Sequence, residues 1–121
     1  FAAGLMEAAA LAWTDRTRVL LVAYDLPPPF PLSECREIVA PFAVALALSP
    51  PPTGRRLATL QLARNAERPA SRLDDPQLEI LRRGNPAARS LPLLRAIAHS
   101  IASRVTLSTG ESGGLELEIE P

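Results

Sequence analysis

The side chains that could act as nucleophiles or bases are few and far apart in this sequence. Cys35 is the single cysteine and His99 the single histidine. A cysteine nucleophile needs a base close to it, but no histidine lies near Cys35 in the sequence. His99 has no carboxylate three or four residues away that could orient it as a general base. We therefore predict a loop cysteine, a structural or solvent-facing histidine, and no catalytic residue.

The carboxylates do not indicate a catalytic pair either. Asp25 and Glu34 lie in one proline-bearing loop, at a spacing that fixes no geometry between them. The adjacent Asp74 and Asp75 precede a proline and an apolar pattern, which favours helix capping over acid–base chemistry. Glu7 is the only charge in an apolar segment, and burial of a carboxylate requires a partner or its neutralisation. We expect Glu7 to form a structural polar contact, such as a hydrogen bond to the backbone of a missing part of the protein.

The sequence holds no signal for a cofactor, a metal ion or nucleic acid. Gly110, Gly113 and Gly114 lack the spacing of a phosphate-binding loop and predict a hairpin loop instead. One cysteine and one histidine cannot provide the spacing of a zinc site. The 13 basic residues, all of them arginine, are balanced by 13 acidic residues. A net charge of zero gives no electrostatic argument for nucleic-acid binding.

Length and composition indicate one globular domain of 121 residues, of which 47% are hydrophobic. A single cysteine excludes a disulfide within the chain and fits a reducing cytoplasm, where we expect the protein. The opening apolar segment is shorter than the roughly 20 residues that a membrane-spanning helix needs. It also lacks the basic start and the cleavage site of a signal peptide.

The elements that position these residues begin with an apolar segment. Residues 1–13, FAAGLMEAAALAW, predict a helix that is hydrophobic on every side and therefore buried. Arg18 to Tyr24 has the length and composition of a strand. Because the chain opens inside a buried helix, we expect it to be the C-terminal piece of a larger protein.

The next predicted elements are a loop and a second strand. Residues 25–40 form a proline-bearing loop with a helical turn at 33–37, and residues 41–49 form the strand. Large apolar residues alternate with alanines along that strand, so both of its faces are apolar and both should be covered. We expect the alanines of the first helix to pack against the alanine face.

The remaining sequence predicts an edge strand over residues 57–64 and a helix that starts at Asp75 and ends at Gly84. A second helix, over residues 91–102, is capped by Ser90 and carries one apolar stripe. Its members are Leu94, Ile97, Ala98 and Ile101. Strands near residues 104–108 and 115–120 form a hairpin. The predicted class is α/β: a buried helix and strands of a mixed sheet, followed by two helices and a β-hairpin.

Four segments together resemble a known family, the β-ketoacyl synthase-like N-terminal domains, which include ketosynthase chain-length factors of the thiolase fold. The segments are FAAGLMEAA at residues 1–9, VLLVAYD at 19–25, YDLPPP at 24–29 and APFAVALAL at 40–48. The order of helix, strand, proline loop and two further strands carries the resemblance, which is good over residues 1–64 and vague afterwards. It implies a thiolase-like core over residues 1–64 and a helical segment with a terminal hairpin over residues 65–121.

The resemblance also implies where the chemistry lies. In ketosynthases the acyl-accepting cysteine lies on a tight turn at the start of this helix, which corresponds to a position upstream of Phe1. The catalytic histidines and lysine of the family lie in its second half, and this chain has no lysine and one histidine. Phe1 and Met6 would lie near the acyl tunnel, or belong to the core as apolar residues of a buried helix usually do. Glu7 could then line an acyl pocket instead of forming a structural contact.

The function implied by the resemblance is a non-catalytic, chain-length-factor-type subunit. It would partner an active ketosynthase and an acyl carrier protein in polyketide, aryl-polyene or fatty-acid-type biosynthesis, and its own N-terminal fragment is a further candidate partner. Two alternatives stay open. The chain could be an autonomous α+β interaction or ligand-binding module. It could also be a fragment of an active condensing acyltransferase whose cysteine lies upstream of Phe1.

Overall fold

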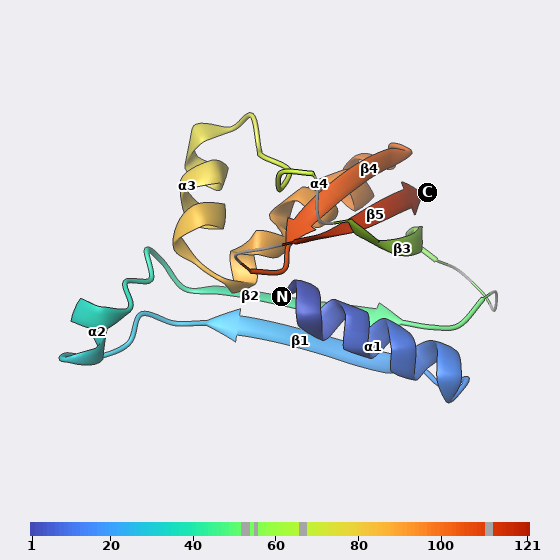
Figure 1. Cartoon of the computed structure of the whole chain (residues 1–121), viewed down its shortest axis with the longest axis horizontal. Coiled ribbons are helices and arrows are strands. Elements are labelled where there is room, and N and C mark those ends of the chain that lie inside the picture. Colours follow the sequence, from blue (N-terminus) through green and yellow to red (C-terminus); the bar gives the residue numbers. More distant parts are fainter. Residues whose placement is uncertain (52–53, 55, 66–67, 111–112) are drawn as a thin grey trace.

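The fold was determined as a computed structural model, which describes residues 1–51, 54, 56–65, 68–110 and 113–121. It contains both helices and strands (Figure 1). In chain order they are α1 (Ala2–Thr14), β1 (Val19–Asp25), α2 (Leu32–Cys35), β2 (Phe42–Leu48), β3 (Thr59–Asn65), α3 (Pro76–Gly84), the 3₁₀ helix η1 (Ala87–Ser90), α4 (Leu91–His99), β4 (Ser103–Ser108) and β5 (Gly114–Glu120).

The described strands form two antiparallel sheets. β1 and β2 pair along their whole length, with Leu21 opposite Leu46, and the second sheet has the order β3-β5-β4. In Figure 1, α1 lies along the β1–β2 ribbon, and the three-stranded sheet lies above it. The α/β class predicted from the sequence is therefore confirmed, and the strands are divided between two small sheets.

The core lies where α1, α4 and the two sheets meet. Its buried members come from the start of α1, from α4 and from both strands of the β4–β5 pair, and apolar side chains of β1 and β2 pack against them. Because α1 contributes only its first turns to this cluster, the start of that helix is its best anchored part. The buried members are Ala2, Leu5, Leu93, Val105, Leu107, Leu115, Leu117 and Ile119.

Helix α1 buries one stripe and exposes the rest of its surface. The buried residues recur at helical spacing, whereas Leu11 and Trp13 are about half exposed. Trp13 lies under the guanidinium of Arg16, whose central carbon is 4.7 Å from the ring centroid. The expectation of a helix buried on every side was wrong for this chain, because the described elements pack against only one side of it. The buried residues are Ala2, Leu5, Ala8 and Ala12.

The alanine face of β2 is exposed, so the predicted contact with the alanines of α1 was also wrong. Ala43, Ala45 and Ala47 are exposed, and the large residues of the same strand point to the opposite, half-buried face. Helix α1 packs on that opposite face, where a Cβ added at Gly4 would meet the side chain of Leu21 at 3.4 Å. The larger side chains attract the helix because they offer more apolar area to bury.

Several predicted boundaries are confirmed. The strand after residue 57 lies at the edge of its sheet as β3, and the terminal hairpin forms as β4 and β5. The oxygen Oδ1 of Asp75 accepts hydrogen bonds from the backbone N–H of Gln77 (2.8 Å) and of Leu78 (3.0 Å), which makes Asp75 the N-cap of α3. The hairpin glycines Gly110 and Gly113 have φ angles of 133° and 147°, which favour glycine. The two residues between them lie outside the described residues.

Helix α4 differs from the prediction in its end and its buried face. It ends at His99, because Ser100 adopts a left-handed conformation with φ 50°. Ser90 precedes the helix as predicted, but its hydroxyl donates to the carbonyl oxygen of Ala87 (2.8 Å) and does not cap α4. The fully buried residue is Leu93, whereas Ile101 of the predicted stripe is exposed. Ile97 of the stripe packs against the core as predicted, but Ala98 is exposed and Ile101 lies beyond the end of the helix.

Candidate functional site

A buried polar junction joins the ends of β1 and β2 to η1. Asn85 is completely buried, and its side-chain amide donates to the carbonyl oxygen of Ala40 (2.8 Å) and more weakly to that of Asp25 (3.4 Å). Its side-chain oxygen accepts from the N–H groups of Ala87 (2.9 Å) and Ala88 (3.1 Å). These bonds satisfy buried backbone groups from three segments, so Asn85 holds the two halves of the chain together.

Asp25 belongs to the same junction and not to a carboxylate pair. Its Oδ2 accepts from the N–H of Ala87 (2.8 Å), and its Oδ1 lies 3.4 Å from a guanidinium nitrogen of Arg36. Asp74 pairs with Arg95 (2.7 Å) on the surface. Asp25 and Asp74 therefore each have a structural partner.

Phe1 and Met6, predicted to lie near the acyl tunnel of the resembled fold, are both partly buried and pack against the core cluster. They lie at the start of α1, where that helix meets the two sheets. Neither residue lines the described cavity. Their packing accounts for both residues as core, and their role near a substrate stays a prediction.

The two predicted non-catalytic side chains, Cys35 and His99, are exposed and lie on different elements. Cys35 ends the short helix α2, and His99 ends α4. In Figure 1, α2 lies at the far left of the molecule and α4 beside β4, so no cysteine–histidine pair is formed. Glu7 is also exposed in this chain, so its expected contact with a further part of the protein stays a prediction.

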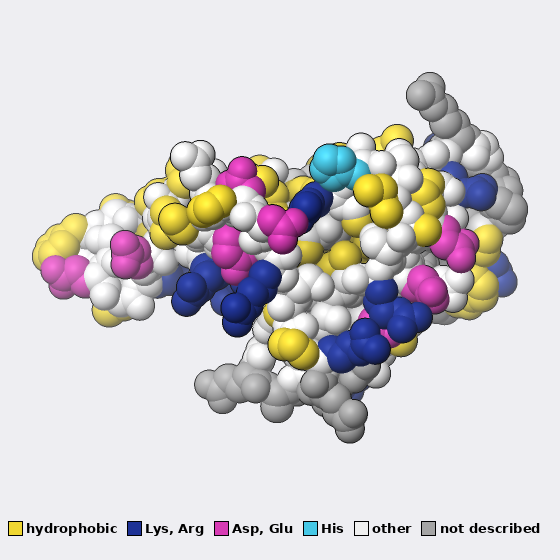
Figure 2. Space-filling view, turned by 90° about the horizontal axis from the view of Figure 1, so that it is seen from above, with side chains coloured by type: hydrophobic (Ala, Val, Ile, Leu, Met, Phe, Trp, Pro, Cys, Tyr) yellow, Lys and Arg dark blue, Asp and Glu magenta, His cyan; other side chains and the backbone are white. Residues whose placement is uncertain are grey.

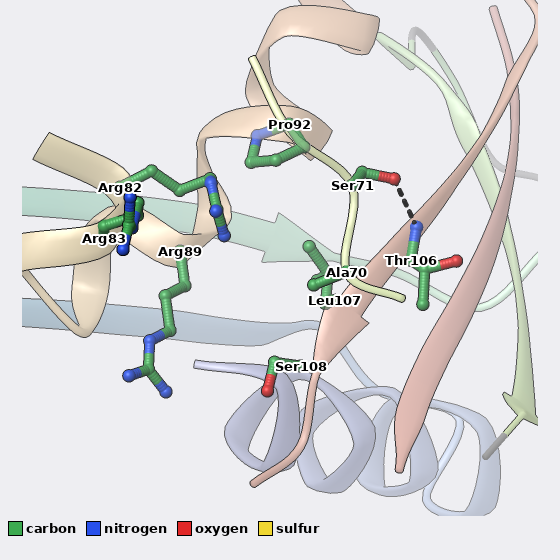
Figure 3. Close-up of a pocket in the computed structure, with 9 residues that line it drawn as sticks. All are labelled: Ala70, Ser71, Arg82, Arg83, Arg89, Pro92, Thr106, Leu107 and Ser108. Atoms are coloured by element: carbon green, nitrogen blue, oxygen red, sulfur yellow. Dashed lines mark hydrogen bonds between the residues drawn. The ribbon is translucent and has the colours of Figure 1, made fainter. Parts of the chain in front are cut away.

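Sequence reasoning missed a cavity of about 270 Å³ between α3, η1, α4 and β4. We call it the arginine pocket, because three arginines contribute to its lining (Figure 3). The sequence signal was the doublet Arg82-Arg83 followed by Arg89. In the sequence, the doublet indicates only basic residues that suit the C-terminal end of a helix. The lining residues are Ala70, Ser71, Arg82, Arg83, Arg89, Pro92, Thr106, Leu107 and Ser108.

Glu79 neutralises one of these arginines. The Nη2 and Nε atoms of Arg82 lie 2.6 Å and 2.7 Å from the carboxylate oxygens of Glu79, and the N–H of Leu73 donates to the same carboxylate (3.0 Å). The hydrogen bonds from Arg82, and then that from Leu73, lower the pKa of Glu79 to about 2. The same contact raises the pKa of Arg82, so both groups carry their charge across the physiological range.

A second surface that sequence reasoning missed is the uncovered side of the first sheet. We call it the β1–β2 outer face, and it is apolar throughout. Its large members Leu20, Val22 and Tyr24 are 66%, 54% and 68% exposed. The antiparallel register places Val22 opposite Ala45, so the alanines of β2 lie beside these side chains on one continuous surface. The members are Leu20, Val22, Tyr24, Ala43, Ala45 and Ala47.

Charges and metal ligands are dispersed over the described part of the chain. Figure 2 shows basic side chains lying beside acidic ones, without a continuous basic surface on the face seen from above. Among residues 1–51, 54, 56–65, 68–110 and 113–121, no three histidine, cysteine or acidic side chains come together as metal ligands. None of the helices in these ranges is long and apolar enough to cross a membrane.

Comparison with protein families matches residues 1–112 to the family described as beta-ketoacyl synthase, N-terminal domain. The match extends well past residue 64, where the resemblance read from the sequence fades. Neither the curated proteins nor the solved structures include a significant match to the chain. Helices combined with two small antiparallel sheets are consistent with part of a thiolase-like ketosynthase domain. From the extent of the family match, the chain belongs to the β-ketoacyl synthase N-terminal domain family.

Proposed function

We propose that this chain is part of a non-catalytic, chain-length-factor-type subunit that partners an active ketosynthase. The pathway would be polyketide, aryl-polyene or fatty-acid-type biosynthesis in the cytoplasm, with an acyl carrier protein delivering the acyl chain. Residues 1–64 would supply the thiolase-like core, and residues 65–121 the helical segment and hairpin. The single observation that carries the proposal is the apolar β1–β2 outer face on a member of a ketosynthase family.

The chemistry of the β1–β2 outer face supports a protein partner. Contiguous apolar surface is uncommon on monomeric proteins unless it binds something. Tyr24 adds an aromatic side chain with a polar end, a residue type that is enriched at protein interfaces. The small side chains of Ala43 and Ala45 would allow close approach by a helix or a sheet. We propose that a ketosynthase subunit, or an N-terminal part of the same domain, covers this face.

The non-catalytic part of the proposal is supported by the positions of the reactive side chains. Cys35 and His99 are exposed on different elements, and the sequence holds no lysine. A cysteine nucleophile requires a base and an environment that favours the thiolate. Phe1 and Met6 would contribute through position alone, as apolar side chains close to an acyl chain.

Co-expression with an active ketosynthase tests this function. The chain carries an affinity tag, and the co-purified ketosynthase is quantified with and without an acyl carrier protein. We compare Val22→Arg, on the β1–β2 outer face, with Ile80→Arg, which places the same charge on an exposed side chain of α3. We expect the unmodified chain and Ile80→Arg to retain the ketosynthase, and Val22→Arg to retain at least about tenfold less, because an unpaired charge is costly in an apolar interface.

The outcomes separate the alternatives. Equal recovery with both variants would show that the outer face is not the interface. A folded monomer that recovers no ketosynthase and no N-terminal part of the domain would favour the autonomous interaction module. Condensing activity that appears when the N-terminal part is added, and is lost on alkylation of a cysteine in that part, would favour the active acyltransferase.

A further inference from the structure

The arginine pocket carries a net positive charge that the fold does not neutralise. Arg82 is paired with Glu79. Arg83 and Arg89 line the same cavity, and neither guanidinium group makes a hydrogen bond or ion pair within the part of the chain that the structure describes. Two uncompensated arginine side chains therefore line one cavity. Folding gains nothing from placing like charges close together, because they repel.

The opposite wall of the pocket carries Ser71 and Thr106 over an apolar floor, and their hydroxyl groups point away from the arginines. Figure 3 shows Ser71 and Thr106 on adjacent segments across from the arginines. The Ser71 hydroxyl oxygen accepts from the N–H of Thr106 (2.9 Å), which leaves its own proton free to donate. Ala70, Pro92 and Leu107 provide apolar contacts in the same lining.

We propose that the arginine pocket binds a phosphate-type dianion, either as the free ion or as the head group of an organic phosphate ester. A phosphate monoester carries about −1.5 to −2 charges at neutral pH and three acceptor oxygens. This charge matches the two uncompensated arginines, and the guanidinium fork fits phosphate oxygens in a bidentate manner. The ion pair with Glu79 neutralises the charge of Arg82 and holds its side chain in the wall of the pocket.

The helix ends near the pocket do not cancel this attraction. The last turn of α3 contributes roughly half a negative charge from its free carbonyl groups, and Arg82 and Arg83 lie on this turn. Two full positive charges exceed that partial charge. The volume of about 270 Å³ falls just below the roughly 300–1,000 Å³ of typical small-molecule sites, so the pocket suits an anionic head group with a small substituent.

Isothermal titration of the whole chain with inorganic phosphate and with butyl phosphate tests the proposal, in a chloride buffer of constant ionic strength. We expect saturable binding at one site. We expect Arg83→Gln and Arg89→Gln each to weaken it about tenfold, since each removes charge-assisted hydrogen bonds to the dianion. Arg18→Gln, which removes the same charge from an exposed residue that does not line the pocket, should bind like the unmodified chain.

The two ligands distinguish the sources of the phosphate group. Tighter binding of butyl phosphate, with a ³¹P resonance shift that is lost in Arg89→Gln, would assign the pocket to an organic phosphate ester. Equal binding of both would assign it to the free ion. An absence of heat and of any ³¹P shift beyond a chloride control would overturn the proposal, as would equal affinities in the Arg83→Gln, Arg89→Gln and Arg18→Gln chains. Circular dichroism confirms that each variant is folded, and neither exposed arginine supports the core.

Discussion

At the scale of single residues, we expect the buried side chain of Asn85 to stabilise the fold more than the exposed ion pairs do. Its side chain makes hydrogen bonds with backbone groups of Ala40, Ala87 and Ala88 while fully buried. Exposed ion pairs such as Arg95 with Asp74 contribute little, because water screens them. A buried amide that satisfies several backbone groups is costly to remove, since each lost partner becomes a buried, unpaired polar group.

We expect Asn85→Ala to lower the free energy of unfolding by about 3 kcal/mol, from the desolvation of the backbone groups that it would leave unpaired. Urea denaturation followed by circular dichroism measures this. Gln61→Ala is the matched control, because it removes an amide side chain from an exposed position of β3. A loss below about 1 kcal/mol for Asn85→Ala would mean that water replaces the amide in the junction.

Glu79 makes the stability of the chain sensitive to acid. Its pKa is lowered from 4.5 to about 2 by the hydrogen bonds of Arg82 and Leu73. A carboxylate with a lowered pKa stabilises the folded state fully above pH 4.5, and this contribution is lost as the pH falls toward 2. The relevant window is therefore pH 4.5 down to 2, and neutral pH lies above it.

We expect Glu79→Gln to flatten the fall in thermal midpoint between pH 5 and pH 2.5, because the variant has no carboxylate to protonate there. Differential scanning calorimetry at a series of pH values measures the midpoint. Glu7→Gln removes an exposed glutamate from α1 and serves as the control with the same chemical change. If both variants reproduce the pH dependence of the unmodified chain, the Glu79–Arg82 pair does not hold in solution.

At the scale of elements, the end of α3 is shaped by the segment that precedes β2. A Cβ added at Gly84, the last residue of α3, would overlap the side chain of Val39. The N–H of Val39 also donates to the carbonyl oxygen of Gly84 (3.1 Å). The glycine is thus required by close packing between two segments, and not only as a helix terminator.

Helix propensity and packing oppose each other at this position. Propensity alone would make Gly84→Ala stabilising by about 1 kcal/mol. We expect it instead to destabilise the chain by about 1–3 kcal/mol, the usual cost of overpacking. In the double variant Gly84→Ala with Val39→Ala, that cost should largely disappear. A cycle of the two single variants and the double variant, unfolded in urea, measures the coupling. Additive effects of the two substitutions on the free energy of unfolding would mean that the cost of Gly84→Ala does not come from overlap with Val39.

Local signals in the sequence were sufficient for most elements. The Asp75-Pro76 pair predicted the start of α3, and the glycines after Ser108 predicted the terminal hairpin, because capping and turn chemistry act within a few residues. The end of α4 was not predictable in this way. Ser100 takes a left-handed conformation that serine does not favour. The N–H of Ile101 donates a hydrogen bond to the carbonyl oxygen of Ala96, which closes the helix there.

The candidate sites depended on contacts between distant segments. Arg82 and Arg89 share one pocket with Ser71 and Thr106 only because the fold packs α3 and η1 beside β4 and the segment that precedes α3. The arginine pocket therefore could not be inferred from spacing along the chain. The exposure of the alanine face was also hidden, because an apolar pattern indicates that a face needs cover without showing what covers it. The family resemblance, by contrast, rests on the order of elements, and that order was readable directly.

At the scale of the whole molecule, the β1–β2 sheet is exposed in two ways. Its outer face is apolar, and in the described chain each of its strands pairs only with the other, so its edges offer unpaired backbone groups. A two-stranded sheet is marginally stable unless other elements pack on it. Here α1 and the residues of the core cluster pack on it, and they leave the outer face uncovered. Free edges and apolar faces both promote association with other chains.

This arrangement leads to a prediction about the purified chain without any partner. We expect it to self-associate as its concentration rises, through contacts of the β1–β2 outer face, because burying Leu20, Val22 and Tyr24 removes apolar surface from water. Sedimentation velocity over a concentration series measures the association. Val22→Arg should shift the chain to a monomer at concentrations where Ile80→Arg still associates. A chain that stays monomeric throughout would contradict this prediction and show that the apolar character of this face alone does not cause association.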